Sequence, residues 1–282
     1  MLLGLLFSLA ITMAEGSATG DTATPPANAA IYDYKLESAN VDANAERELL
    51  ALVNRARARA ELPPLQLDPR LSQAAREHAA AMAAHQELSH QFSGEPDLAR
   101  RLATVALHVD EAAENVASAD SPDRAHEGLM NSPPHRENLL HPAYNIVGLG
   151  AVRCGSMLYV VEDFGHNLPI YSAQQAADIV AKSVTGARGK ARLPELRRRE
   201  GSFLQPDACS ASRGSLVRTS ASPAPPQSRF IFRYTAMTPE SLPTITSRAI
   251  ADGSIRAFAV GACFARSDRY PDGVYSMMLV FY

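Results

Sequence analysis

Two apolar runs with the composition of strands follow one another in the middle of the chain, after a long stretch of helical pattern. The runs are YNIVGLGAV (144–152) and MLYVVEDF (157–164), and Arg-Cys-Gly-Ser separates them. β-Branched and aromatic residues on both sides of a short turn predict a hairpin of buried strands. Helices that precede such a strand pair predict an α+β or sandwich domain.

The helical pattern before the hairpin falls into two long segments. The first, NAERELLALVNRARARAEL (44–62), repeats apolar residues at helical spacing, and Asn44 is its expected N-cap. The second opens at Asp68-Pro69, which is a typical helix start. Its apolar stripe includes two histidines a heptad apart, which we interpret as packing residues. The stripe consists of Leu71, Ala74, His78, Met82 and His85.

The same helix-start pattern recurs at Ser121-Pro122 and in NSPPHRENLL (131–140). In the latter, Ser132 is the expected cap, and His135 falls in the first turn, where prolines restrict the backbone. A fixed ring suits a ligand-binding or catalytic role. A stiff helix entry alone would also explain the prolines.

From about residue 172 the pattern starts again and ends in a second predicted hairpin, RAFAVGACFA (256–265) and GVYSMMLVFY (273–282). VGLGAV in the first hairpin resembles FAVGAC in the second, and LYVVEDF resembles VYSMMLVF. This likeness predicts a degenerate internal repeat, although unrelated strands also look alike. No histidine occurs between 172 and 282, so a histidine-based site is not expected there.

The N-terminal segment MLLGLLFSLAITMA (1–14) has the length of a signal-peptide core and is shorter than the roughly 20 residues that span a bilayer. No basic residue precedes it. We nevertheless predict a signal peptide at 1–14, a flexible leader at 15–43, and a secreted protein, extracellular or periplasmic, with no stable membrane span.

Charge and cysteine content restrict the possible partners and the possible disulfides. The net charge is −3 and the basic residues are scattered, so no nucleic-acid partner is expected. The three cysteines allow at most one internal bridge. We predict Cys209–Cys263, which would tie the second half together across its long loop and leave Cys154 free.

Three residues of the first half could form a site with catalytic or binding chemistry: His90, Glu114 and His135. Two imidazoles and a carboxylate can hold zinc or another divalent cation and leave one position open to water. Spacing alone supports this weakly, because the chain has no His-Glu-x-x-His helix and separation in sequence says nothing of distance.

Four separated motifs resemble the CAP superfamily of cysteine-rich secretory, antigen 5 and pathogenesis-related 1 proteins, in particular its bacterial SCP-domain branch. They are LVNRARARAELPPLQLDPRLSQAAREHAAAMAAHQELSH, ENVA, LMNSPPHRENLLHPAYNIVGLGAV and YVVEDFG, within residues 44–166. The resemblance implies a three-layer α-β-α sandwich at 44–168, followed by a smaller α+β region at 172–282.

In that family, two histidines and two acidic residues line a cleft, and some members bind zinc or other divalent cations there. The resemblance makes His90 and His135 the histidines, and the expected metal ligands, and Glu114 the first acid. The second acid is missing from its usual place. Leu129 stands where the family has Trp, and Glu127 is a weak substitute.

The resulting hypothesis is a secreted binding module whose cleft binds a divalent cation or small ligand. Its partners would be a small apolar ligand, the cell wall or a protein. The alternative is a metal-dependent hydrolase of peptide or cell-wall bonds, with Glu114 as the base. A purely structural envelope protein is a third reading.

Overall fold

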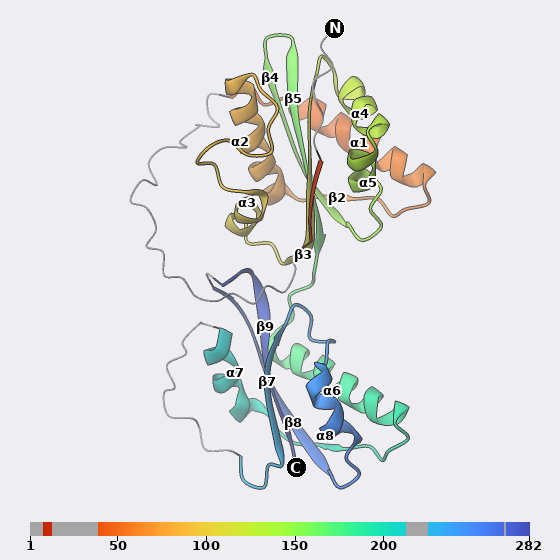
Figure 1. The fold of residues 1–282 in the computed structure, drawn as a ribbon, viewed down its shortest axis with the longest axis vertical. Coiled ribbons are helices and arrows are strands. Elements are labelled where there is room, and N and C mark those ends of the chain that lie inside the picture. The colour runs from red at the N-terminus through yellow and green to blue at the C-terminus, as the bar shows by residue number, and fades with distance from the viewer. Residues whose placement is uncertain (1–7, 13–38, 213–224, 268) are drawn as a thin grey trace. The chain divides into compact units, whose positions relative to one another are not determined.

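The computed structural model describes residues 8–12, 39–212, 225–267 and 269–282. The chain forms two compact units, Met1–Asn167 and Leu168–Tyr282, each with helices and a sheet (Figure 1). The predicted α+β class is therefore confirmed. Of the predicted signal peptide, only residues 8–12 are described, and they form a strand. Most of the predicted leader lies outside the described residues.

Unit 1 is a three-layer sandwich around a five-stranded sheet of order β1-β3-β5-β4-β2. β2 pairs with β4 in parallel, and the other pairs are antiparallel. Figure 1 shows α2 and α3 on one side of the sheet and α1, α4 and α5 on the other. The elements are α1 (Ala43–Arg59), α2 (Pro69–His85), α3 (Leu98–Thr104), α4 (Pro122–Asn131), α5 (Pro133–Leu139), β1 (Ser8–Thr12), β2 (Gln66–Leu67), β3 (Val109–Ala119), β4 (Ile146–Cys154) and β5 (Met157–Asn167).

The helix starts follow local hydrogen bonding, with one correction to the sequence prediction. The cap of α1 is Asp42 rather than Asn44, because the Asp42 carboxylate accepts the N–H groups of Asn44 and Ala45. Asp68 caps α2 as predicted. Ser132 is the N-cap residue of α5 as predicted, but its side chain makes no capping hydrogen bond. Its hydroxyl lies instead 2.7 Å from Nδ1 of His135.

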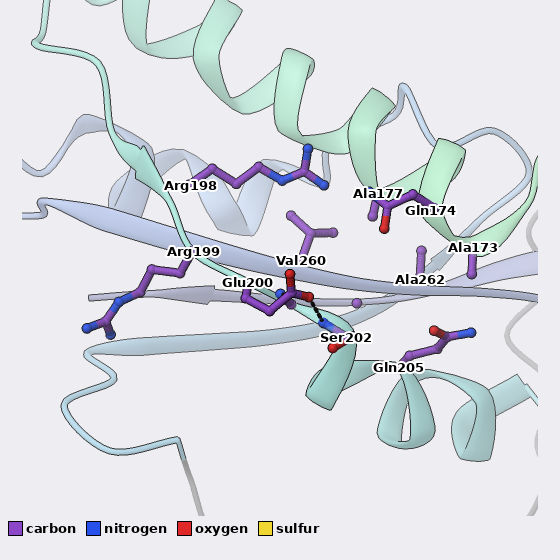
Figure 2. A pocket seen from close by; sticks show the side chains of 12 residues that line it. Ala173, Gln174, Ala177, Arg198, Arg199, Glu200, Ser202, Gln205, Val260 and Ala262 are labelled. Carbon is purple, nitrogen blue, oxygen red and sulfur yellow. Dashed lines mark hydrogen bonds between the residues drawn. The ribbon is translucent and has the colours of Figure 1, made fainter.

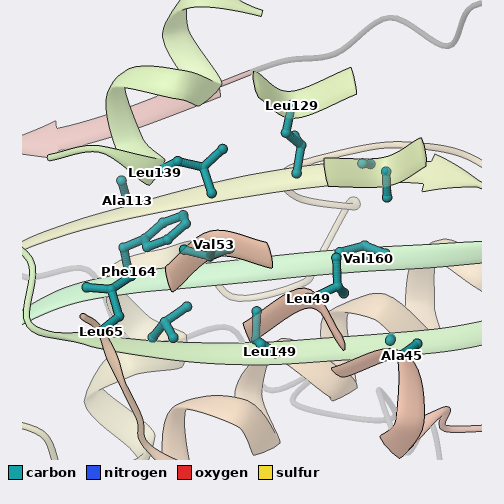
Figure 3. Close-up of a cluster of buried hydrophobic side chains, with 14 of the residues drawn as sticks. Ala45, Leu49, Val53, Leu65, Ala113, Leu129, Leu139, Leu149, Val160 and Phe164 are labelled. Carbon is teal, nitrogen blue, oxygen red and sulfur yellow. The ribbon is translucent and has the colours of Figure 1, made fainter. Parts of the chain in front are cut away.

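The main core of unit 1 lies between the sheet and the α1, α4 and α5 layer (Figure 3). Alternate residues of each strand supply it because side chains of a strand alternate between faces. Leu49 and Val53 of α1 and Leu129 of α4 are fully buried there. A separate set of clusters fills the face toward α2 and α3. This alternation fixes which face each polar residue of β3 and β5 occupies.

Unit 2 contains a four-stranded sheet of order β6-β8-β9-β7, in which β6 is parallel to β8. This repeats the order β2-β4-β5-β3 of unit 1. Within unit 2, α6 and α8 lie on one side of the sheet and α7 on the other (Figure 1). The elements are α6 (Ala173–Lys190), α7 (Gln205–Ser212), α8 (Ser247–Ala251), β6 (Arg197–Arg198), β7 (Phe230–Ala236), β8 (Ala257–Ser267), β9 (Tyr270–Phe281) and two 3₁₀ turns, η2 (Ser202–Leu204) and η3 (Thr244–Thr246).

A buried arginine near the end of the first helix of each unit gives the two folds a common reference. Arg57 donates to the carbonyls of Pro63, Leu139, His141 and Tyr144. In unit 2, Arg188 donates in the same manner to the carbonyls of Pro194, Ile250 and Asp252. Both arginines join the first helix to the loop that enters the central hairpin.

With this reference, the strand registers align the hairpins residue by residue. Gly150 corresponds to Gly261, and Phe164 corresponds to Phe281. This is the alignment that the likeness of the two sequence runs predicts. That the second unit arose by duplication stays a prediction, but the positional equivalence can be used to compare the two units.

The disulfide of the chain lies within unit 2 and links α7 to β8 through Cys209 and Cys263. Cys154 is a free thiol. The predicted pairing is therefore confirmed. α7 contributes Ala208 to an apolar cluster on the sheet, and the disulfide adds a covalent link to β8.

Candidate functional site

The candidate site of unit 1 is built on β3, on the face toward α2 and α3, where Glu114 projects from the middle of the strand. His90 lies in the loop after α2, and its Nδ1 is 2.7 Å from Oε1 of Glu114. The Glu114 side chain is 1% exposed, whereas that of His90 is 18% exposed. The carboxylate thus orients a ring that is partly exposed, although its Nε2 is buried.

The second oxygen of Glu114 is also occupied. Arg101 of α3 forms an ion pair with Glu114 Oε2 and donates to the carbonyl of His90, 3.2 Å away. Burial alone would raise the pKa of Glu114, but the hydrogen bond from His90 and the neighbouring charges of His78 and Arg101 bring it below its ordinary value. Glu114 is therefore a carboxylate that accepts the Nδ1–H of His90.

His78, expected from the sequence to pack in α2, belongs to the same polar cluster. Its Nδ1 lies 2.6 Å from Oε1 of Glu95, and its Nε2 lies 2.8 Å from the carbonyl of Ser89. Burial opposes ionisation of Glu95, but the hydrogen bond and charge of His78 prevail and lower its pKa. His78 therefore anchors the loop that carries His90.

A second acidic side chain stands directly opposite Glu114. Asp163 of β5 is the cross-strand partner of Glu114 and is fully buried. Burial first, and then the charge of Glu114, raise the pKa of Asp163 well above its ordinary value. This favours the neutral form of Asp163, so that Glu114 carries the negative charge of the pair.

The next residues along both strands form a separate polar network on the opposite face, toward α5. Asn115 donates to Oε2 of Glu162 at 3.3 Å and to the carbonyl of His135 at 3.2 Å. Asn138 donates to Oδ1 of Asn115 at 2.9 Å. His135 is completely buried in this layer. The sheet therefore separates His135 from the pair of His90 and Glu114.

The structure thus brings together two of the three residues expected to line a metal-binding cleft. Both oxygens of Glu114 have partners, and Arg101 already supplies a positive charge beside them. Within the described part of the chain, no three His, Cys, Asp or Glu side chains are placed to hold one metal ion. The arrangement around His90 does not fit the zinc or other divalent-cation site that the resemblance implies.

Sequence reasoning missed Glu95, Arg101 and Asp163. A signal for Asp163 was present, because a Glu-Asp pair inside the apolar run MLYVVEDF must bury at least one carboxyl group. Arg101 carries no such local signal, since many surface helices contain arginine. Glu127, the weak substitute for the second acid, is exposed.

Unit 2 shows what the same fold looks like without this site. The positions equivalent to Glu114 and Asp163 are Ile231 and Val280, which pair with each other across the sheet. Likewise, the positions of Asn115 and Glu162 hold Phe232 and Leu279. All four replacements are hydrophobic. The sheet itself therefore does not require the buried polar residues of unit 1.

Comparison with known proteins agrees with the motif resemblance. Residues 50–164 match the family model described as the cysteine-rich secretory protein family, CAP. The uncharacterised protein YkwD of Bacillus subtilis (strain 168) is 30% identical over 113 residues, which cover 40% of this chain and 44% of that protein. The match therefore spans less than half the length of this curated relative.

Two similar solved structures are an extracellular protein containing an SCP domain from Bacillus anthracis and an outer surface protein from Borrelia burgdorferi. The first is 27% identical with a TM-score of 0.40, covering 43% of this chain and 40% of its own. The second is 19% identical with a TM-score of 0.43, covering 46% and 99%. In the described residues, no helix is long and apolar enough to cross a membrane. Over residues 50–164, the first unit of this chain thus matches the CAP domain of the cysteine-rich secretory protein family.

Proposed function

We propose that the chain is a secreted binding module that uses His90 to accept a hydrogen bond from its ligand. The observation that carries the proposal is the state of the His90 ring. Glu114 holds Nδ1, whereas Nε2 is buried and has no hydrogen-bond partner among the described residues. A buried acceptor without a partner costs about 1–3 kcal/mol, which a ligand that supplies a donor would recover.

Secretion is part of this proposal. The apolar segment 1–14 has the character of a signal peptide, whose removal would take β1 from the sheet and leave β3 as its edge strand. The Cys209–Cys263 bridge suits an oxidising compartment outside the cytosol. The ligand that fits best is rich in hydroxyl groups, because a single lone pair held at a fixed angle selects an O–H or N–H donor. A cell-wall glycan outside the cell meets this description.

The metal-dependent hydrolase is less well supported. It would need His90 and His135 at one metal and Glu114 as a base with a free oxygen. His135 lies across the sheet, and Glu114 is engaged by His90 and Arg101. A divalent cation as the cleft ligand meets the same difficulty.

Co-sedimentation of the purified chain with isolated peptidoglycan tests the proposal. We expect binding by the wild type, loss of at least about tenfold in affinity in His90→Ala, and no change in His85→Ala, a matched exposed histidine. No soluble fragments should appear. Release of fragments in a chelator-sensitive reaction would instead support the hydrolase, and binding that survives His90→Ala would refute the role of His90.

A further inference from the structure

Unit 2 contains a cavity of about 310 Å³ at the sheet edge beside the start of α6. Figure 2 shows its lining: Gln174 and Ala177 come from α6, Arg198 from β6, and Ser202 and Gln205 from η2 and the start of α7. Val260, Gly261 and Ala262 of β8 form its floor. This cavity is separate from the His90 site, which belongs to unit 1.

The equivalent place in unit 1 is filled by an ion pair. Arg76 of α2 grips Glu46 of α1 with two hydrogen bonds, of 2.7 and 2.6 Å. The Glu46 side chain is 5% exposed. The pair therefore closes the gap between the two helix layers beyond the edge of β4.

Positional equivalence shows what replaces this pair in unit 2. With Arg57 aligned to Arg188 along the first helix, Glu46 corresponds to Ala177.

The second helix can be aligned by its contact with the equivalent glycines of the hairpin. A Cβ on Gly150 would meet the carbonyl of Ala75, and one on Gly261 would meet that of Leu204. The residues that follow these contacts are Arg76 and Gln205. Unit 2 thus lacks both the carboxylate and the arginine of the pair, and both substitutes line the cavity.

The cavity of unit 2 does contain an arginine, but it comes from another element than Arg76 does in unit 1. Arg198 lines the cavity from β6, at the position that Leu67 occupies in unit 1. Its Nη1 lies 2.6 Å from Asp178, in a pair whose two side chains are both partly exposed. Exposed ion pairs of this kind contribute little to stability, so a ligand can compete with Asp178 for the guanidinium. Arg198 can therefore engage a ligand.

The remaining charges at the cavity are already satisfied within the protein. The Glu200 carboxylate accepts the N–H groups of Gly201 and Ser202, at 2.9 and 2.8 Å. The Arg199 guanidinium stacks over the ring of Tyr282 at 4.2 Å. Among the lining side chains, Arg198 and Gln174 both contact the partly exposed Asp178, Gln174 through Nε2 at 2.8 Å, and each keeps further N–H groups. With the amide of Gln205, these N–H groups are the donors that a carboxylate requires.

We propose that this cavity binds a small carboxylic acid, whose carboxylate takes the place that Glu46 fills in unit 1. The guanidinium of Arg198 binds the charge, and the amides of Gln174 and Gln205 complete the hydrogen bonds. The alanines at 173 and 177 leave room for the carbon skeleton. Unit 2 would thus be a second binding unit of different chemistry from unit 1.

Calorimetric titration of the full chain with succinate tests this proposal. We expect a Kd of about 1 mM or tighter, no binding of the neutral analogue succinamide, and at least a tenfold weaker Kd in Arg198→Gln, because a charge-assisted hydrogen bond is lost. Arg197→Gln, an exposed neighbour on β6 that does not line the cavity, is the matched control and should bind as the wild type does.

A second variant tests the equivalence with unit 1. Ala177→Glu should place a carboxylate in the cavity and abolish succinate binding while the circular dichroism spectrum stays unchanged. Absence of succinate binding to the wild type would overturn the proposal. So would equal binding by Arg198→Gln, or binding of inorganic phosphate in preference to succinate.

Discussion

Glu162 makes the stability of unit 1 depend on pH in a direction opposite to that of an ordinary surface carboxylate. It is fully buried, and burial raises its pKa from 4.5 to about 7, although a hydrogen bond from Asn115 opposes the rise. Its other oxygen, Oε1, has no hydrogen-bond partner among the described residues. Ionisation of Glu162 therefore places a negative charge in the core with a single donor beside it.

The magnitude follows from proton linkage. Between pH 4.5 and about 7 the unfolded chain has released this proton and the native state still holds it. The native state binds more protons in that window, so the free energy of unfolding falls as the pH rises. Each pH unit is worth about 1.4 kcal/mol for one group, which gives a total of about 3 kcal/mol.

Glu162→Gln isolates this contribution, because the amide keeps the shape of the side chain and cannot ionise. Urea unfolding followed by circular dichroism from pH 4 to pH 8 should show wild-type stability falling relative to the variant by about 3 kcal/mol. Asp163 titrates in both proteins and cancels in the difference. The exposed Glu48→Gln is the control and should track the wild type. Parallel curves for wild type and Glu162→Gln would refute the reasoning.

Two further predictions concern how helices are held against the sheets, by the disulfide in unit 2 and by a glycine in unit 1. Replacing both Cys209 and Cys263 by Ser should destabilise unit 2 by about 4 kcal/mol, because the disulfide closes a loop with a sequence separation of 54. Calorimetric melting measures this loss, and Cys154→Ser should have no comparable effect. Gly150→Ala would place Cβ 2.3 Å from the backbone of Ala75, and the forced shift of α2 should cost about 1–3 kcal/mol in urea unfolding. Gly186→Ala, which meets nothing within 4 Å, should instead stabilise α6 by about 0.5–1 kcal/mol. Equal effects of the two glycine substitutions would contradict the close approach of helix and strand.

The sequence predicted the fold well where local patterns determine it. The Asp68-Pro69 start of α2 and both hairpins follow from side-chain chemistry within a few residues. Ser132 is the N-cap residue of α5 as predicted, but its hydroxyl contacts His135 instead of the helix backbone. Local patterns cannot rank such competing partners.

The site was harder to predict than the fold, because it depends on which face of β3 and β5 each residue occupies. His90 and Glu114 were identified from family motifs, and the structure places them in contact. His135 comes from an equally clear motif but lies on the other side of the sheet. Arg101 could not be found by pattern, since its partner is contributed by a different element. Alternate residues of a strand lie on opposite faces of the sheet, and this alternation decides which residues share a site. The face of each residue is known only once the strand register is known.

We expect Glu114 to fix the proton of His90 on Nδ1 and to leave Nε2 as an acceptor for a ligand. Long-range ¹H–¹⁵N correlation of the ¹⁵N-histidine-labelled chain at neutral pH measures this directly, with His90→Ala assigning the signal. We predict a protonated Nδ1 and an unprotonated Nε2 for His90. A bare Nδ1, or protons on both nitrogens, would contradict the account.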